Sequence, residues 1–148
     1  MNLIKSNTNQ CLLASFAMVL ETTTKTLTEE LGHDGKDIVS RLIEPYCYRS
    51  FHPQEFTDVC FKRGKSLVLI EKYPKLMHGT ELIDHSSFMD PDRFDTYLEH
   101  TGVLCGTSNR VGHAVALIGG KVYDPRGYVY KKLLGFHNLE PLYFLMVV

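Results

Sequence analysis

The sequence predicts an α+β protein in which N-terminal helices, one of them buried and cysteine-bearing, pack on a C-terminal antiparallel sheet. Two observations predict this class. Helical patterns fill most of the first half of the chain and strand patterns most of the second half. A glycine pair joins two consecutive strands, which is typical of antiparallel neighbours rather than of βαβ units. The 148 residues contain no repeat or linker, so we expect a single domain over 1–148.

Four helices are predicted in the first half. Residues 11–21 are apolar on nearly every face, which is typical of a helix buried at the centre of a fold. Thr26 and Glu29 fit a capping box for a second helix. A third helix is predicted over 37–43, where a proline stops it, and a fourth over 53–63, which a proline opens and a glycine follows.

Strands dominate the rest of the chain. In order, we expect a strand over 66–71, a helix from 90 to about 100, a short strand over 103–106, a polar loop over 107–112, two strands joined by Gly119 and Gly120, and a last strand over 142–148. The last strand is apolar throughout, so we expect it to lie centrally in the sheet.

The glycine pair fixes a register. If residues 119–120 form a two-residue turn, Ile118 pairs with Lys121. Side chains alternate between faces along a strand, so His113 and Asp124 become diagonal neighbours on one face, roughly 7–8 Å apart at Cα. A carboxylate at that distance can hold an imidazole in one tautomer and orientation.

Cys11 stands where the apolar helix begins. The helix dipole and the free N–H groups there favour a thiolate, which is the nucleophilic form of cysteine. Cys11, His113 and Asp124 therefore form a candidate for nucleophilic catalysis, and the register places Arg126 on the face of the latter two. Each of the three alone has an ordinary structural interpretation; their combination favours catalysis.

These residues resemble a known superfamily. Asn-Gln-Cys-Leu-Leu-Ala-Ser-Phe-Ala-Met at 9–18, Gly-His-Ala-Val at 112–115 and Tyr-Asp-Pro at 123–125 resemble the papain-like cysteine peptidases. The likeness is greatest to compact bacterial and phage members near the bacteriocin-leader-processing peptidases. The resemblance implies a papain-like fold, with Cys11 as nucleophile, His113 as general base and acid, and Asp124 as the orienting residue. It also implies a cysteine hydrolase, either a peptidase or isopeptidase or a related amidase. The expected substrate is a peptide or protein, and a host protein in the case of a phage-encoded chain.

Two positions depart from the family pattern. The family often supplies a glutamine to the oxyanion hole about half a dozen residues before the nucleophile, and no glutamine stands there. The candidate donors are Asn7, Gln10 or the backbone N–H of Cys11. The usual small residue after the nucleophile is replaced by Leu12.

These departures motivate a second hypothesis, an inactive papain-like scaffold that acts as a binding or inhibitory protein, phage-encoded and directed at a host factor. A third is a structural subunit whose last strand pairs with another copy.

The loop over 107–112 directly precedes His113. Asn109 and Arg110 are candidates for a substrate-binding rim, since the guanidinium can meet an acidic group; an ordinary polar connection is the alternative. Cys105, just before this loop, is expected to be a buried strand residue near the site.

Metals, cofactors and charged partners are not expected. Cys47, His52 and Cys60 match no common zinc spacing. The net charge of −1, without long blocks of either sign, excludes nucleic-acid or membrane-surface binding by bulk charge. With no membrane-length apolar run, no visible leader and four cysteines without close pairing, we expect a cytoplasmic protein with reduced thiols.

Overall fold

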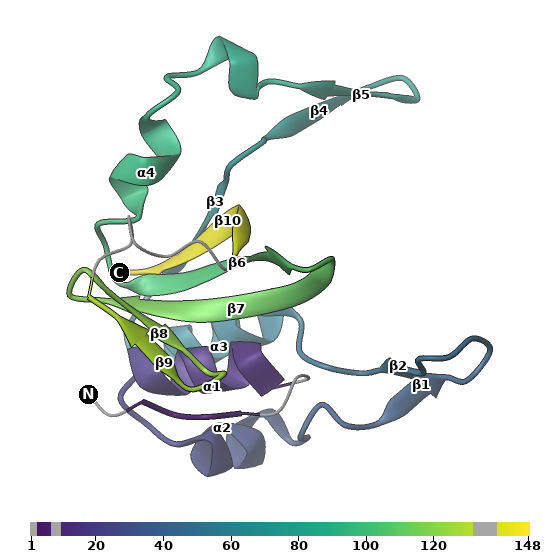
Figure 1. Ribbon diagram of the computed structural model, residues 1–148, viewed down its shortest axis with the longest axis vertical. Helices are drawn as coiled ribbons and strands as arrows, with labels where there is room; N and C mark the ends of the chain where they lie inside the picture. The colour runs from purple at the N-terminus through teal and green to yellow at the C-terminus, as the bar shows by residue number, and fades with distance from the viewer. Residues whose placement is uncertain (1–2, 7–9, 132–138) are drawn as a thin grey trace.

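The computed structural model describes residues 3–6, 10–131 and 139–148. A twisted antiparallel sheet forms the centre, with three helices on one face and a short fourth helix on the other (Figure 1). The predicted α+β class is confirmed. The helices are α1 (Cys11–Val19), α2 (Thr24–Leu31), α3 (Pro53–Lys62) and α4 (Arg93–Tyr97).

The central sheet has six strands in the order β3-β10-β6-β7-β8-β9. Their bounds are β3 (Leu67–Glu71), β6 (Gly102–Ser108), β7 (Val111–Ile118), β8 (Lys121–Asp124), β9 (Tyr128–Tyr130) and β10 (Glu140–Val147). The last strand is internal, as predicted, and pairs with β3 on one side and β6 on the other. Both of its edges are therefore occupied, which contradicts the hypothesis that this strand pairs with a second copy.

Helix α1 is the core helix that its composition predicted. Its residues from Leu13 to Met18 are buried, and it packs on β7 and β6. Phe16 stacks on Phe56 of α3 with ring centroids 4.1 Å apart. A second apolar cluster, on the opposite face of the sheet, joins Phe94 of α4 to the strands. Because α1 is held on nearly all sides, the position of its first residue is fixed by packing.

Helix α2 begins earlier than predicted, since Thr23 is the N-cap residue and its Oγ1 accepts a hydrogen bond from Thr26 N–H at 3.1 Å. The third predicted helix, over 37–43, is wrong. Residues Ile38–Ser40 form strand β1, which pairs with β2 (Cys47–Tyr48). An isolated seven-residue helix is marginal in water, and the apolar side chains of this segment are exposed, Leu42 to 93%.

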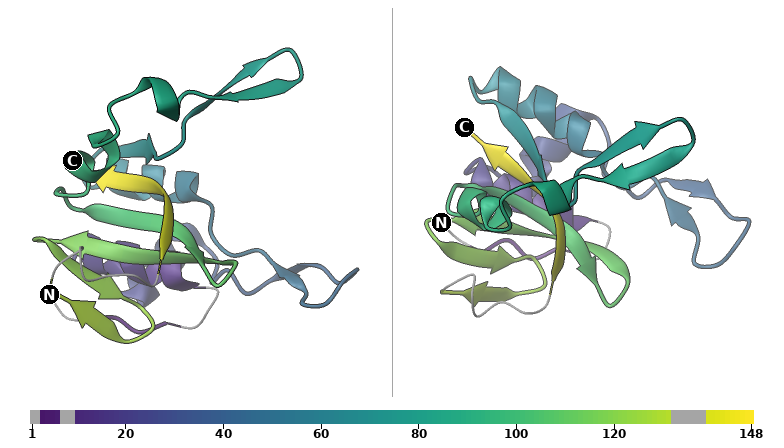
Figure 2. Two further views of the ribbon diagram at one scale, coloured as in Figure 1. Left: turned by 45° about the horizontal axis from the view of Figure 1, so that its top comes forward. Right: turned by 90° about the horizontal axis from the view of Figure 1, so that it is seen from above.

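Two long hairpins project from the body (Figure 2). The first arm is β1–β2, and the second is β4 (Lys75–His78) paired with β5 (Glu81–Asp84). Both carry exposed apolar side chains: Val39, Leu42 and Ile43 on the first, Leu76, Met77 and Leu82 on the second. Neither arm was predicted, because a strand without a buried face lacks the alternation that identifies strands in a sequence.

The segment 86–101 also differs from expectation. The helix predicted from 90 to about 100 is reduced to α4, which follows a 3-10 turn over Ser86–Phe88.

The predicted polar loop over 107–112 is a tight hairpin, since β6 runs to Ser108 and β7 starts at Val111. Its two turn residues adopt positive φ angles, 51° at Asn109 and 65° at Arg110. Such a two-residue turn matches the twist of the strands it joins.

The register predicted from the glycine pair is confirmed. Ile118 pairs with Lys121, and Ala116 with Tyr123. Strand β8 ends at Asp124, so the start of β7 extends beyond it at this end of the sheet. In the described part of the chain, no helix has the length and apolar character needed to cross a membrane.

Candidate active site

Cys11 is the first residue of α1 and is half-buried. The N–H groups of a first helical turn have no acceptor within their own helix, so they are available to an oxygen beside the thiol. Two adjoining hollows meet here, and both are lined by Cys11, Val111, Gly112 and His113. The thiol therefore lies between two spaces that a substrate can enter.

His113 lies at the same end of the sheet. Its Nε2 is 2.8 Å from Oδ1 of Asp124, the contact that the hairpin register predicted. With Nε2 engaged, Nδ1 is the nitrogen left to face Cys11. Burial alone would lower the pKa of His113, but hydrogen bonds to Asp124 and Cys11, together with the charges of both, raise it to about 9. The imidazole is therefore stabilised in its protonated form.

Asp124 is fully buried, and it accepts hydrogen bonds from Arg126 in addition to its contact with His113. Its oxygens accept hydrogen bonds from the backbone N–H of Arg126 at 2.9 Å and from the Arg126 side chain, the shortest at 2.8 Å from Nη2. Burial would raise the pKa of Asp124, but the hydrogen bonds from His113 and Arg126 hold it well below its usual range. Asp124 is an ionised carboxylate shared by two cationic groups.

The turn that follows Asp124 is tied to the start of the described chain. The backbone N–H of Ser6 donates to the carbonyl of Pro125 at 3.0 Å, and Gly127 N–H donates to the carbonyl of Asp124 at 2.9 Å. These bonds fix the carboxylate beside the histidine. Pro125 has no N–H to give to a ladder, which accounts for the end of β8 at this point.

Arg126 was not singled out as a site residue, although the predicted register already placed it on the face of His113 and Asp124. Besides Asp124 it contacts the β6–β7 hairpin, where its Nη1 donates to Ser108 Oγ at 3.0 Å. Its side chain is 40% exposed. The arginine therefore links the carboxylate to the rim of the site.

The first hollow has a volume of about 430 Å³, and its polar side chains include the two basic residues His113 and Arg126. Its lining comprises Ser6, Cys11, Ser108, Asn109, Val111, Gly112, His113, Pro125 and Arg126. The second, of about 370 Å³, contains the larger apolar and aromatic groups Leu12, Phe51 and Tyr143. The two sides of Cys11 thus offer chemically different surroundings.

Cys105 lines the second hollow, so it lies near the site and is buried, as predicted. Burial raises the pKa of its thiol to about 12. Burial likewise raises the pKa of the neighbouring Tyr143. Cys105 therefore stays a neutral thiol at physiological pH and is not a second nucleophile.

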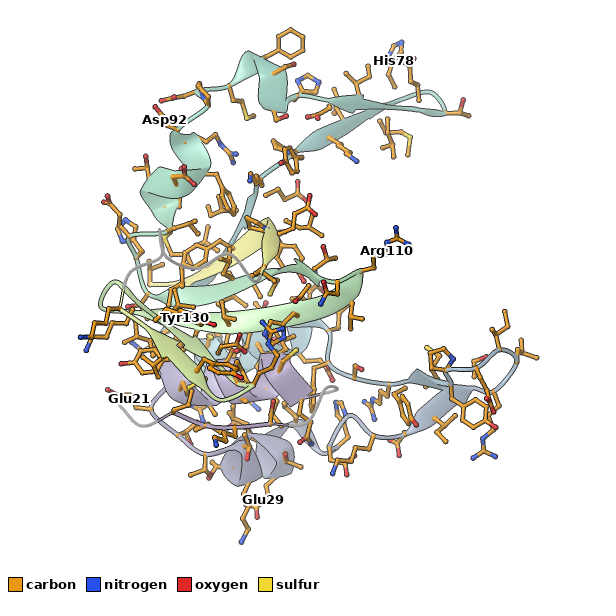
Figure 3. All side chains as sticks on the ribbon, in the orientation of Figure 1. Glu21, Glu29, His78, Asp92, Arg110 and Tyr130 are labelled. Carbon is orange, nitrogen blue, oxygen red and sulfur yellow. The ribbon has the colours of Figure 1, made fainter. Side chains whose placement is uncertain are left out.

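The predicted oxyanion and rim residues have different placements. Gln10 directs Nε2 to the carbonyl of Asp34 at 3.0 Å and lines neither hollow. Asn7 lies outside the described residues. Asn109 lines the first hollow, but Arg110 projects outward from the tip of the β6–β7 hairpin (Figure 3). Of the three predicted oxyanion donors, the backbone N–H of Cys11 is the one that the described structure places beside the thiol.

The cysteine and histidine residues considered for zinc are separated. Cys60 is buried in the core, Cys47 is exposed on the first arm, and Nδ1 of His52 accepts the N–H of Gln54 at the start of α3. Within residues 3–6, 10–131 and 139–148, no three His, Cys, Asp or Glu side chains come together in a way that could hold a metal ion.

A thiol at a helix start, an imidazole beside it and a carboxylate behind the imidazole are the groups that nucleophilic acyl transfer requires. The first hollow is lined by the thiol-bearing and imidazole-bearing residues, while the carboxylate behind them is buried. Compared with models of protein families, with curated proteins and with solved structures, the chain matches none of them.

Proposed function

We propose that this protein is a cysteine hydrolase with a papain-like arrangement, which cleaves peptide or isopeptide bonds through a thioester intermediate. The observation that carries the proposal is the 2.8 Å contact of Asp124 with His113, beside Cys11 and at the meeting of two hollows. Neither a core cysteine nor a strand-end histidine needs such an arrangement.

In the first half-reaction, Cys11 and His113 react as an ion pair in which the imidazolium already holds the proton of the thiol, and the sulfur attacks the carbonyl carbon of the substrate. The resulting oxyanion accepts a hydrogen bond from the backbone N–H of Cys11. His113 then gives its proton to the departing nitrogen, the C–N bond breaks, and a thioester remains on Cys11. Asp124 keeps the imidazolium oriented and compensates its charge.

In the second half-reaction, His113 takes a proton from a water molecule, whose oxygen attacks the thioester. The C–S bond breaks, the sulfur recovers the proton, and a carboxylic acid leaves. An amine in place of water would give a new amide by the same steps. Water is the acceptor in the reaction proposed for this protein, which makes it a hydrolase.

The test is the rate at which iodoacetamide alkylates each cysteine at pH 6, followed by peptide mass mapping. Cys47 is exposed and serves as the ordinary thiol in the same molecule. We expect Cys11 to react at least about 100-fold faster than Cys47, because an imidazole held beside a thiol keeps it reactive at low pH. The substitution His113→Ala should remove that advantage, and His33→Ala should retain it.

Equal rates at Cys11 and Cys47 in the wild-type protein would contradict the hydrolase proposal. The two arms support a second candidate in that case, because their exposed apolar side chains suit a protein that binds a partner. In this alternative the chain is an inactive papain-like scaffold with a binding or inhibitory role. Such a protein would leave Cys11 unreactive while its arms remained necessary for partner binding.

A further inference from the structure

We infer that the first hollow contains a carboxylate-binding subsite built on Arg126, so that the substrate carries a carboxylate close to the bond that is cleaved. This inference rests on the proposed acyl transfer at Cys11 and names the class of substrate. The carboxylate belongs either to an acidic side chain or to a free chain terminus, since both present the same group to a guanidinium.

The hydrogen bonds of Arg126 leave donors for a ligand. A guanidinium has five N–H donors. Nε and Nη2 donate to Asp124, and Nη1 donates to Ser108 Oγ at 3.0 Å. These bonds use three of the five donors of a side chain that is 40% exposed at the hollow, where Tyr130 also acts on its charge. A carboxylate is the group best matched to the planar donor fork of a guanidinium.

The charges around the hollow also favour an anion. Asp124 is a single carboxylate with two cationic neighbours, His113 and Arg126, and it is fully buried. The described lining contains no Asp or Glu, while Ser6 and Asn109 add polar groups. Arg126 is therefore the cation at the hollow that a ligand carboxylate can meet without displacing Asp124.

The subsite lies within reach of the nucleophile. Arg126 and Cys11 line the same hollow. Hydrogen bonding to Asp124 raises the pKa of Arg126 most, and a charge on Cys11 adds to this effect, so the two groups interact electrostatically. Arg110, the arginine that the sequence favoured for an acidic group, projects away from the body instead (Figure 3). The two arginines thus provide a matched pair for an experiment.

The experiment compares alkylating reagents that differ only in charge. N-iodoacetylglycine and N-iodoacetylglycinamide present a terminal carboxylate or its neutral amide, and N-iodoacetylaspartic α-amide and N-iodoacetylasparagine amide do the same for a side-chain carboxylate. The readout is the ratio of alkylation rates at Cys11, acid over amide, at pH 7. We expect a wild-type ratio of about three to ten for at least one pair, as a partly exposed charge-assisted bond allows.

Arg126→Gln should reduce this ratio to about one or below, and Arg110→Gln should leave it unchanged. A ratio is used because Arg126 also supports Asp124: disturbance of that support slows both reagents of a pair alike, whereas loss of the subsite slows only the acid. Arg126→Lys retains the charge and should retain part of the preference. The pair with the larger wild-type ratio identifies the source of the carboxylate.

Two negative outcomes are distinguishable. If Cys11 reacts slowly with all four reagents, the hydrolase proposal fails. If it reacts rapidly with all four, and the acid-to-amide ratio is near one or is unaffected by Arg126→Gln, the hydrolase proposal stands and the carboxylate subsite is excluded.

Discussion

Two histidine–carboxylate pairs occur among the residues that the structure describes, and the distances between nitrogen and oxygen in the two pairs are nearly equal. Nε2 of His113 is 2.8 Å from Asp124, and Nε2 of His33 is 2.7 Å from Glu55. Both histidine side chains are largely buried. The pairs differ in what the other ring nitrogen contacts, and that difference separates a site from a structural support.

The His33 pair uses all of its groups within the protein. Nδ1 of His33 accepts the N–H of Gly35 at 3.1 Å, and its ring stacks on Phe51 at 4.8 Å between centroids. The second oxygen of Glu55 accepts the N–H of His52 at 2.8 Å and completes the capping box of α3. This pair fastens the base of the first arm to α3, and neither ring nitrogen remains for a thiol.

His113 instead hydrogen-bonds the thiol of Cys11 in addition to Asp124, and that thiol borders two hollows. A histidine–carboxylate contact is therefore weak evidence for catalysis by itself. The informative features are a histidine that also contacts a nucleophile and the open space in front of both. Changes that affect the two pairs unequally test this distinction.

The largest difference should appear in stability when each carboxylate is neutralised. Asp124→Asn leaves two cationic groups without their buried partner, so the free energy of unfolding should fall by about 3–4 kcal/mol. Glu55→Gln removes a partly exposed carboxylate, and we expect a loss of about 1 kcal/mol. Urea unfolding at pH 7 measures both. Equal losses would mean that the two pairs are equivalent supports, contrary to this comparison.

A second difference should appear in the pH dependence of stability. The pKa of His113 is raised from its ordinary 6.5 to about 9 on folding. Proton binding therefore stabilises the fold fully below pH 6.5, and this contribution is lost as the pH rises through about 9. Between pH 7 and pH 9 the free energy of unfolding should fall by about 2 kcal/mol. The decline should disappear in His113→Gln and persist in His33→Gln. If it disappears in His33→Gln and persists in His113→Gln, the loss of stability comes from His33 and the prediction is contradicted.

The smallest expected effect concerns Gln10, which connects the surroundings of the two histidine–carboxylate pairs. Gln10 precedes Cys11, and its side chain bonds the carbonyl of Asp34, next to His33. Gln10→Ala removes one hydrogen bond, so we expect a loss of about 1 kcal/mol in stability. The rate of Cys11 alkylation should change less than about threefold. A drop of tenfold or more would identify Gln10 as a contributor to the site despite its present contact.

The sequence was sufficient for the parts of the fold that have strong local signals. The apolar run predicted α1 because a helix without a polar face must be buried. The glycine pair fixed the register of β7 and β8, and with it the contact between His113 and Asp124. The same register carried the signal for Arg126, which became informative only when its side chain was seen to bond Asp124.

The sequence was insufficient where tertiary contacts decide the structure. Ile38, Val39, Leu42 and Ile43 have a spacing that suits a helix as well as a strand. Their side chains are exposed in the structure, so burial does not favour a helix there, and β-branched residues favour the extended pairing that is found. The contact of Cys11 with His113 depends on how α1 lies across β7, and no local pattern encodes that placement.

Strand β10 has a consequence for how this molecule is made. It is the last strand in chain order, yet it completes the sheet between β3 and β6 and brings Tyr143 to the hollow beside Cys11. Contacts between residues so far apart in the chain require the closure of long loops, which slows folding. During synthesis the helices and strands β6–β8 are made before β10. The edges of β3 and β6 that pair with β10 stay open until β10 leaves the ribosome. The nucleophile is translated before β10, and its surroundings are complete only when that strand is in place.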